Sequence, residues 1–332
     1  MCCVDCIDNF FKLISRSRLQ DLMTILCMDE SSKLLRAYVR TLADNADSTR
    51  IPKEVDIVFS GGAFNGFMGY GVMLYIKALF AKHGVIVHRV SGCSIGSLLA
   101  AFVFADADYQ VDKAFRDSVS EFKRTLRLKP YGEQVDRLTN SISDEDFSKL
   151  NKRLHITYYD LKKREQKVVN RFRSREHLAE CIKRSSHIPC ITTEETRYKG
   201  RYMDGIIPHI FQDGAHPTLY IDLLPRSKLF RVLNVRGETN PHSRILTGIA
   251  EADSFFTHGK SAMCSYVSSW TAAGIAQVRL SELISFIIVA LVEITGQIYS
   301  YIPQAILDNV LSQGLHRCIA SVYGDVMYRL IV

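Results

Sequence analysis

Two glycine-flanked turns, each lying between an apolar run and an amphipathic segment, constrain the fold of this 332-residue chain most strongly. The first turn is residues 61–66, GGAFNG, and the second is residues 92–96, GCSIG. The apolar runs at 55–59 and 85–90 that precede them are typical of buried strands. Helices are predicted after them, over 66–82 and 97–104, and the first should end at His83-Gly84. The repeated order of strand, turn and helix predicts parallel strands joined by a right-handed crossover.

Both turns should lie at the same edge of the sheet, because the carboxyl ends of parallel strands meet there. The G-x-S-x-G pattern around Ser94 is typical of a nucleophile elbow, in which a tight turn exposes the serine hydroxyl. In the glycine-rich first turn, backbone N–H groups can converge on an anion. Acyl transfer requires both parts, a nucleophile and donors for the oxyanion. The two turns therefore indicate a serine-based acyl-transfer site.

Two later motifs extend this pattern. Residues 185–189 read SSHIP, and residues 202–205 read YMDG at the end of a segment, 197–203, that is predicted to be a strand. With these four motifs in this order, residues 55–224 resemble the patatin-like phospholipase family, which uses a Ser–Asp dyad. The resemblance implies the following roles: Ser94 as nucleophile, Asp204 as its base, the N–H groups of Gly61, Gly62 and Ala63 as the oxyanion hole, and Gly66, Gly92, Gly96 and Gly205 as supporting positions.

The resemblance also implies the architecture and the activity. We expect an α/β fold, a patatin-like three-layer α/β/α sandwich with a mostly parallel central sheet and helical extensions at both ends. The polar, turn-rich stretches near 29–50 and 236–243 suggest domain edges. We therefore predict a helical N-terminal extension at 1–50, a catalytic domain at 51–225 and a mainly helical C-terminal region at 226–332. The expected reaction is hydrolysis of fatty acyl esters of phospholipids or other glycerolipids, without a cofactor.

Three residues depart from the pattern of the family. Asn65 stands where the family often has Arg or Lys, Ile206 where it commonly has a second glycine, and Arg184 where alanine is usual. None of them removes a reacting group. However, Asn65 and Ile206 leave open a catalytically silent membrane or lipid-binding scaffold protein of the same fold. A Ser–His–Asp esterase that uses His209, His216 or His242 also stays open.

Composition narrows the partners and the compartment. The nine cysteines are odd in number and lack a repeating spacing, which favours a reducing, intracellular compartment. His209, Asp213 and His216 could approach one another, but no metal-binding motif accompanies them, so we predict no metal.

Residues 113–184 hold 19 basic and 11 acidic residues, a difference of +8, while the whole chain carries +7. Aromatic residues do not interleave with these charges, so we expect no nucleic acid. A basic face would attract an anionic membrane surface, and a solvated helical face is the alternative.

Both ends of the chain suggest contact with a membrane. Cys2, Cys3 and Cys6 precede an apolar and basic segment at 10–26, and cysteines in that position are candidates for palmitoylation. An apolar run at 283–292 is interrupted by Glu293 and is short for a membrane span. For residues 283–306, a packed helix, an interfacial helix and a transmembrane helix all stay open. We predict an intracellular protein that associates peripherally with membranes.

Overall fold

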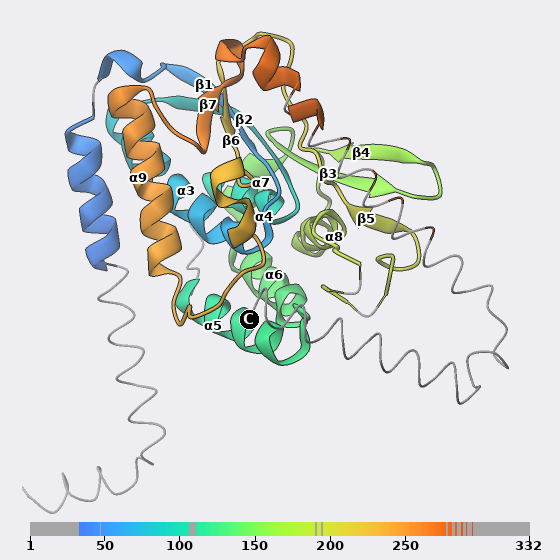
Figure 1. Ribbon diagram of the computed structural model, residues 1–332. Coiled ribbons are helices and arrows are strands. Elements are labelled where there is room, and N and C mark those ends of the chain that lie inside the picture. Colours follow the sequence, from blue (N-terminus) through green and yellow to red (C-terminus); the bar gives the residue numbers. More distant parts are fainter. Residues whose placement is uncertain are drawn as a thin grey trace, which may run out of the picture.

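The computed structural model describes residues 33–46, 48–105, 111–189, 191–193, 195–276 and 278–280, and single positions 283, 287, 290 and 294 (Figure 1). A helix over 33–44 comes first. The elements that follow are η1 (Ser48–Arg50), β1 (Glu54–Phe59), η2 (Ala63–Asn65), α3 (Gly66–His83), β2 (Ile86–Cys93), α4 (Ile95–Phe104), α5 (Val111–Thr125), α6 (Pro130–Ser141), α7 (Asp144–Leu150), β3 (Leu154–Asp160), β4 (Glu165–Val169), α8 (Arg175–Ser185), β5 (Tyr202–Asp204), β6 (Thr218–Ile221), η3 (Arg226–Arg231), α9 (His242–His258), β7 (Cys264–Tyr266) and η4 (Val267–Ser269).

The sheet has seven strands within the described residues, and its centre is parallel. β3, β2, β1 and β6 lie next to one another in this order and pair in parallel. β4 and β5 pair antiparallel with β3, and β7 pairs antiparallel with β6. Helices flank this sheet (Figure 1). The predicted α/β class, with a mostly parallel central sheet, is therefore confirmed.

Side-chain alternation along β1 separates two apolar layers. Val55, Ile57 and Phe59 belong to the main core, which also contains buried residues of α3 and α4. Val58 points to the other face and packs with Phe211 and Tyr220 in a smaller cluster. α4 packs on β1, β2 and β3, whereas α9 lies alongside α3 (Figure 1). The core thus holds α4 against the sheet, and the second glycine turn joins β2 to α4.

The first half of the predicted element order agrees with the structure. β1, α3, β2 and α4 occupy the predicted segments, and α3 ends at Gly84, which has the left-handed φ of 63°. The strand predicted over 197–203 is wrong for its first part, since only Tyr202–Asp204 is a strand. Lys199 and Gly200 have φ values of 49° and 66° and reverse the chain there. A tight turn in this position cannot be read from apolar periodicity.

The predicted terminal extensions are described only in part. The cysteine-rich segment at 1–32 lies outside the described residues, as does most of 283–306. Among the described helices, none combines the length and the apolar character needed to cross a bilayer. From the region beyond 225, β7 joins the sheet through β6, and α9 packs on α3. The exact domain boundaries stay a prediction.

Candidate active site

Ser94 lies in a strained turn between the end of β2 and the start of α4. Its backbone has φ 52° and ψ −135°, a conformation that non-glycine residues rarely adopt. The turn requires glycine on both sides of Ser94. A Cβ atom on Gly92 would lie 2.2 Å from the Gly96 carbonyl oxygen, and one on Gly96 would lie 2.4 Å from the Ser60 carbonyl oxygen. This close packing of backbone against backbone forms the predicted elbow.

The first glycine turn lies against this serine. A Cβ atom on Gly61 would be 3.0 Å from Ser94 Cβ and 3.7 Å from Ser94 Oγ. The same Cβ atom would be 3.7 Å from the Sγ atom of Cys93. The N–H groups of Gly62 and Ala63 have no hydrogen-bond acceptor within the described part of the chain. Both N–H groups are therefore available to a ligand, as an oxyanion hole requires.

Asp204, at the end of β5, places its carboxyl group close enough to Ser94 for the two side chains to interact. Its Oδ1 also accepts the backbone N–H of Ile206 at 2.8 Å. Partial burial of the carboxyl group raises the pKa of Asp204 from 3.8 to about 7, although its interactions with Ser94 and Ile206 oppose this rise. A carboxylate with a pKa in this range is a much better base than an ordinary aspartate.

Ser185, the last residue of α8, connects the two halves of this site. Its Oγ and its carbonyl oxygen both accept the N–H of Ser94, at 2.9 and 3.1 Å. The same carbonyl oxygen accepts the N–H of Gly205 at 3.1 Å, and the Ser185 hydroxyl donates to the Thr157 carbonyl at 2.6 Å. Ser185 is fully buried. The SSHIP motif therefore positions Ser94 relative to Asp204.

Backbone strain is concentrated in this region. Ala63, Ser94 and Ile206 are three of the seven non-glycine residues with positive φ in the described part of the chain. Such conformations cost about 1–3 kcal/mol each and persist where the surrounding structure holds them, which is frequently at functional sites. All three lie in loops that contribute to the site. This distribution supports a functional role independently of the motifs.

The three histidines considered for a triad lie elsewhere. His209 packs on His155 and Phe211, with ring centroids 5.6 and 5.2 Å away. His216 stacks on His88, and His242 is exposed at the start of α9. Within the described residues, neither Ser94 nor Asp204 forms a hydrogen bond with a histidine side chain. Asp204, by contrast, lies next to Ser94.

Arg244, which the sequence analysis did not single out, supports the first glycine turn. Its guanidinium is fully buried and donates to Asn65 Oδ1 at 3.0 Å. It also donates to the carbonyl oxygens of Arg231 and Asn234 and to Glu238 Oε2, at 2.6–2.7 Å. The Asn65 amide in turn donates to the Leu223 carbonyl at 2.8 Å. The Arg244 guanidinium of α9 thus contacts Asn65, the residue at which the first glycine turn departs from the pattern of the family.

We expect Arg244→Met to destabilise the protein by about 3–5 kcal/mol, because removal of one member of a buried ion pair leaves its partners unsatisfied. Arg231→Met is the matched control, since Arg231 faces the same Glu238 carboxylate at 3.7 Å but has 36% of its side chain exposed. An exposed pair of this kind contributes about 0–1 kcal/mol. Urea unfolding of both variants measures the difference. Equal stability of the two variants would show that the Arg244 network does not hold this turn.

Ser94 is buried, whereas Asp204 is partly exposed. Ser94 is only 6% exposed. Phe64 of the first glycine turn belongs to a buried cluster that includes Phe115 and Phe122 of α5. Tyr131 packs on this cluster and donates to Ser186 Oγ at 2.8 Å. A separate cavity of about 490 Å³ is lined by 207–213, Arg89, Gln166 and Arg279, and Ser94 and Asp204 are not among its lining residues.

The comparison with protein families agrees with this geometry. Residues 57–209 match the family described as patatin-like phospholipase. The matched stretch begins in β1 and includes both glycine turns, the SSHIP motif and Asp204. No curated protein matches the chain. Residues 57–209 therefore form a patatin-like phospholipase domain, which supports a lipid acyl hydrolase at the level of the family.

Proposed function

We propose that this protein hydrolyses fatty acyl esters of phospholipids or other glycerolipids through a covalent acyl-Ser94 intermediate, with Asp204 as general base. The observation that carries this proposal is the proximity of Ser94 to an aspartate whose pKa is raised to about 7. At neutral pH a substantial fraction of Asp204 is then both ionised and basic enough to accept the serine proton. An aspartate that is ionised but weakly basic, or basic but fully protonated, could not accept the serine proton.

The reaction runs in two steps. Ser94 Oγ attacks the ester carbonyl while its proton passes to Asp204, and the N–H groups of Gly62 and Ala63 hold the developing oxyanion. Collapse of the tetrahedral intermediate forms the acyl-Ser94 ester, and the proton on Asp204 passes to the departing alcohol. Water, deprotonated by Asp204, then attacks the acyl group, and fatty acid leaves as Ser94 recovers its proton.

An apolar cluster that includes a residue of the first glycine turn favours a fatty acyl substrate. Phe64 connects this turn to a buried cluster to which α5 contributes Phe115, Val119 and Phe122. An acyl chain that packs against this cluster would exchange water for apolar contacts, worth about 0.8 kcal/mol for each buried CH₂ group. The cluster therefore suits a substrate with a long apolar chain.

We also propose that the protein works at a membrane surface. Large apolar side chains at helical positions near the end of the described chain are solvent-exposed: Leu280 by 50%, Leu283 by 54%, Ile287 by 47% and Ile294 by 52%. Spacings of three, four and seven residues place them on one side of a helix. An apolar stripe and a basic chain together suit an anionic lipid interface. The intracellular location stays a prediction.

Vesicles of anionic phospholipid test both parts of this proposal. We expect the protein to sediment with them at low salt, to be released at high salt because the attraction is screened, and to liberate fatty acid from them. The double variant Leu283→Glu/Ile287→Glu should bind about 100-fold more weakly, because two apolar side chains no longer enter the lipid. Leu246→Glu is the matched control, since Leu246 is 46% exposed on α9, outside this stripe.

Binding without fatty acid release would favour the silent scaffold over the hydrolase. Hydrolysis of dispersed and vesicular lipid at equal rates, with no sedimentation at low salt, would contradict work at an interface. If Leu246→Glu weakens binding as much as the double variant, the stripe is not the contact.

A further inference from the structure

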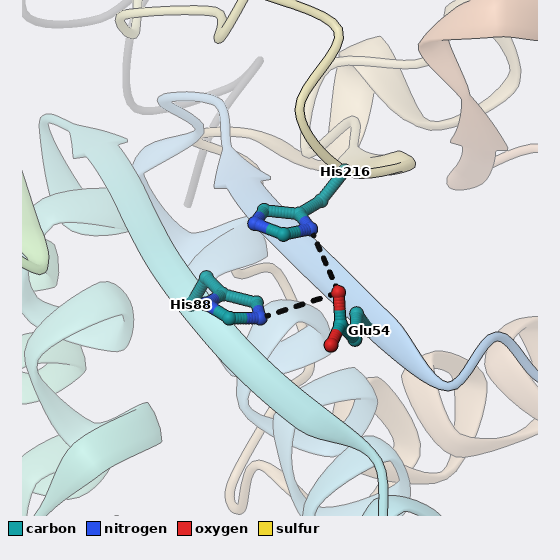
Figure 2. A group of neighbouring side chains, drawn as sticks. All are labelled: Glu54, His88 and His216. Carbon is teal, nitrogen blue, oxygen red and sulfur yellow. Dashed lines mark ion pairs between the residues drawn. The ribbon is translucent and has the colours of Figure 1, made fainter.

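A second group of chemically reactive side chains lies at the opposite end of the parallel strands from Ser94. It consists of Glu54 at the start of β1, His88 in β2 and His216 just before β6 (Figure 2). About 16 Å of strand separates Glu54 from the end of β1, at a rise of about 3.3 Å per residue. The group is therefore distinct from the proposed catalytic site. The sequence analysis had placed His216 with His209 and Asp213, but Asp213 instead pairs with Arg89.

An irregularity of the sheet helps to form this group. Val55 pairs with Val87 and Ile57 pairs with Val90, so two residues of β2, His88 and Arg89, lie opposite a single residue of β1. This is the arrangement of a β-bulge, which redirects side chains and is frequent beside functional sites. Arg89 turns to Asp56 and Asp213, whereas His88 turns to Glu54.

The three potential ligand atoms are arranged as a metal ion requires. Glu54 Oε2 lies 3.2 Å from His216 Nδ1 and 3.6 Å from His88 Nε2, and all ligand atoms lie within 4.8 Å of one another (Figure 2). Ligand atoms around tetrahedral zinc are about 3.3 Å apart, given metal–ligand bonds of about 2.0–2.1 Å. Moreover, His88 Nε2 is buried and has no hydrogen-bond partner among the described residues. That nitrogen lacks the interaction that a cation would supply.

We infer that Glu54, His88 and His216 bind a divalent transition-metal ion, Zn²⁺ in the first place. Two imidazoles and one carboxylate are a ligand set that zinc sites use, with water in the remaining position. The rings now stack at 3.8 Å with 4° between their planes, so binding requires each ring to tilt. The terminal torsion of histidine is broad, and the side chains of Glu54 and His88 are 48% and 36% exposed, which leaves room for this adjustment.

The ion would act as a structural clip. It would connect β1, β2 and the segment that leads into β6, which are three neighbouring positions of the sheet. Because a ligand that binds only the folded state raises its stability, zinc should raise the unfolding temperature. No step of the proposed hydrolysis passes through this site.

The test uses the full chain after treatment with a chelator. Zinc at about 100 times its dissociation constant should raise the unfolding temperature by about 5 °C. His88→Gln and His216→Gln should each lose this shift, as well as one equivalent of zinc in calorimetric titration. His258→Gln is the matched control, since it removes an exposed histidine at the end of α9. His258→Gln should keep both the zinc-induced rise in unfolding temperature and the full number of bound zinc equivalents.

Cysteines also bind zinc, so the comparison between variants decides the assignment. Retention of the shift and of all zinc equivalents by His88→Gln and His216→Gln would overturn the site, as would a parent protein that zinc does not stabilise. Unfolding of each variant in chelator alone shows whether it is folded. If one of the two glutamine variants is unfolded, Glu54→Gln, which alters an exposed side chain, replaces it and should lose the same equivalent.

Discussion

Ser94→Ala should reduce fatty acyl ester hydrolysis by at least about 10⁴-fold, because it removes the hydroxyl that would form the acyl intermediate. The fold should persist, since Ser94 caps no helical N–H group with its side chain and alanine has the same backbone restrictions as serine. Fatty acid release from phospholipid vesicles measures the loss, and circular dichroism checks the fold.

Ser97→Ala is the control for this change. Ser97 lies one turn further along α4, is fully buried and donates to the Ser94 carbonyl at 2.6 Å. Its removal should lower stability by about 1 kcal/mol and leave hydrolysis within a few-fold of the parent. If Ser94→Ala keeps the turnover of the parent, the serine nucleophile is wrong.

Asp204→Asn should reduce turnover by about 10²–10⁴-fold, because an amide cannot accept the serine proton. The pH dependence of the parent carries a second signature. Below pH 7 Asp204 is protonated and cannot act as a base, so turnover should rise as the pH increases through about 7. The residual activity of Asp204→Asn should lack this rise.

Asp222→Asn is a closely matched control. Asp222 follows the end of β6, burial raises its pKa, and its Oδ1 accepts the N–H of the residue two positions on, Leu224, at 2.8 Å, as Asp204 does with Ile206. It does not contact Ser94, so its change should affect turnover by a few-fold at most. A histidine variant, such as His209→Ala, that matches the loss of Asp204→Asn would instead indicate a triad.

The elements that carry the site could be predicted because their signals are local. The apolar run of β1, the helical spacing of α3 and the glycines around Ser94 each constrain a few consecutive residues. The proximity of Ser94 and Asp204 brings together residues far apart in sequence, and it was predicted only because the family resemblance supplied the pair.

The remaining features are long-range contacts that leave no local pattern. Asn65 and Arg244 are 179 positions apart, and no sequence motif connects the two residues. Likewise, His216 meets His88 and Glu54 only through the bulge in β2 and the pairing of β6 with β1. Predictions about the cysteines before residue 10 and about residues 295–306 lie outside the described chain.

Labelling with a fluorophosphonate, followed by peptide mapping, tests the central claim most directly, because this reagent forms a stable bond only with an activated serine. The probe should attach to the peptide that contains Ser94, and its attachment should be slower by orders of magnitude in Asp204→Asn and absent in Ser94→Ala. Labelling of a different residue, or no labelling of the folded parent protein, would contradict a hydrolase in which Asp204 activates Ser94.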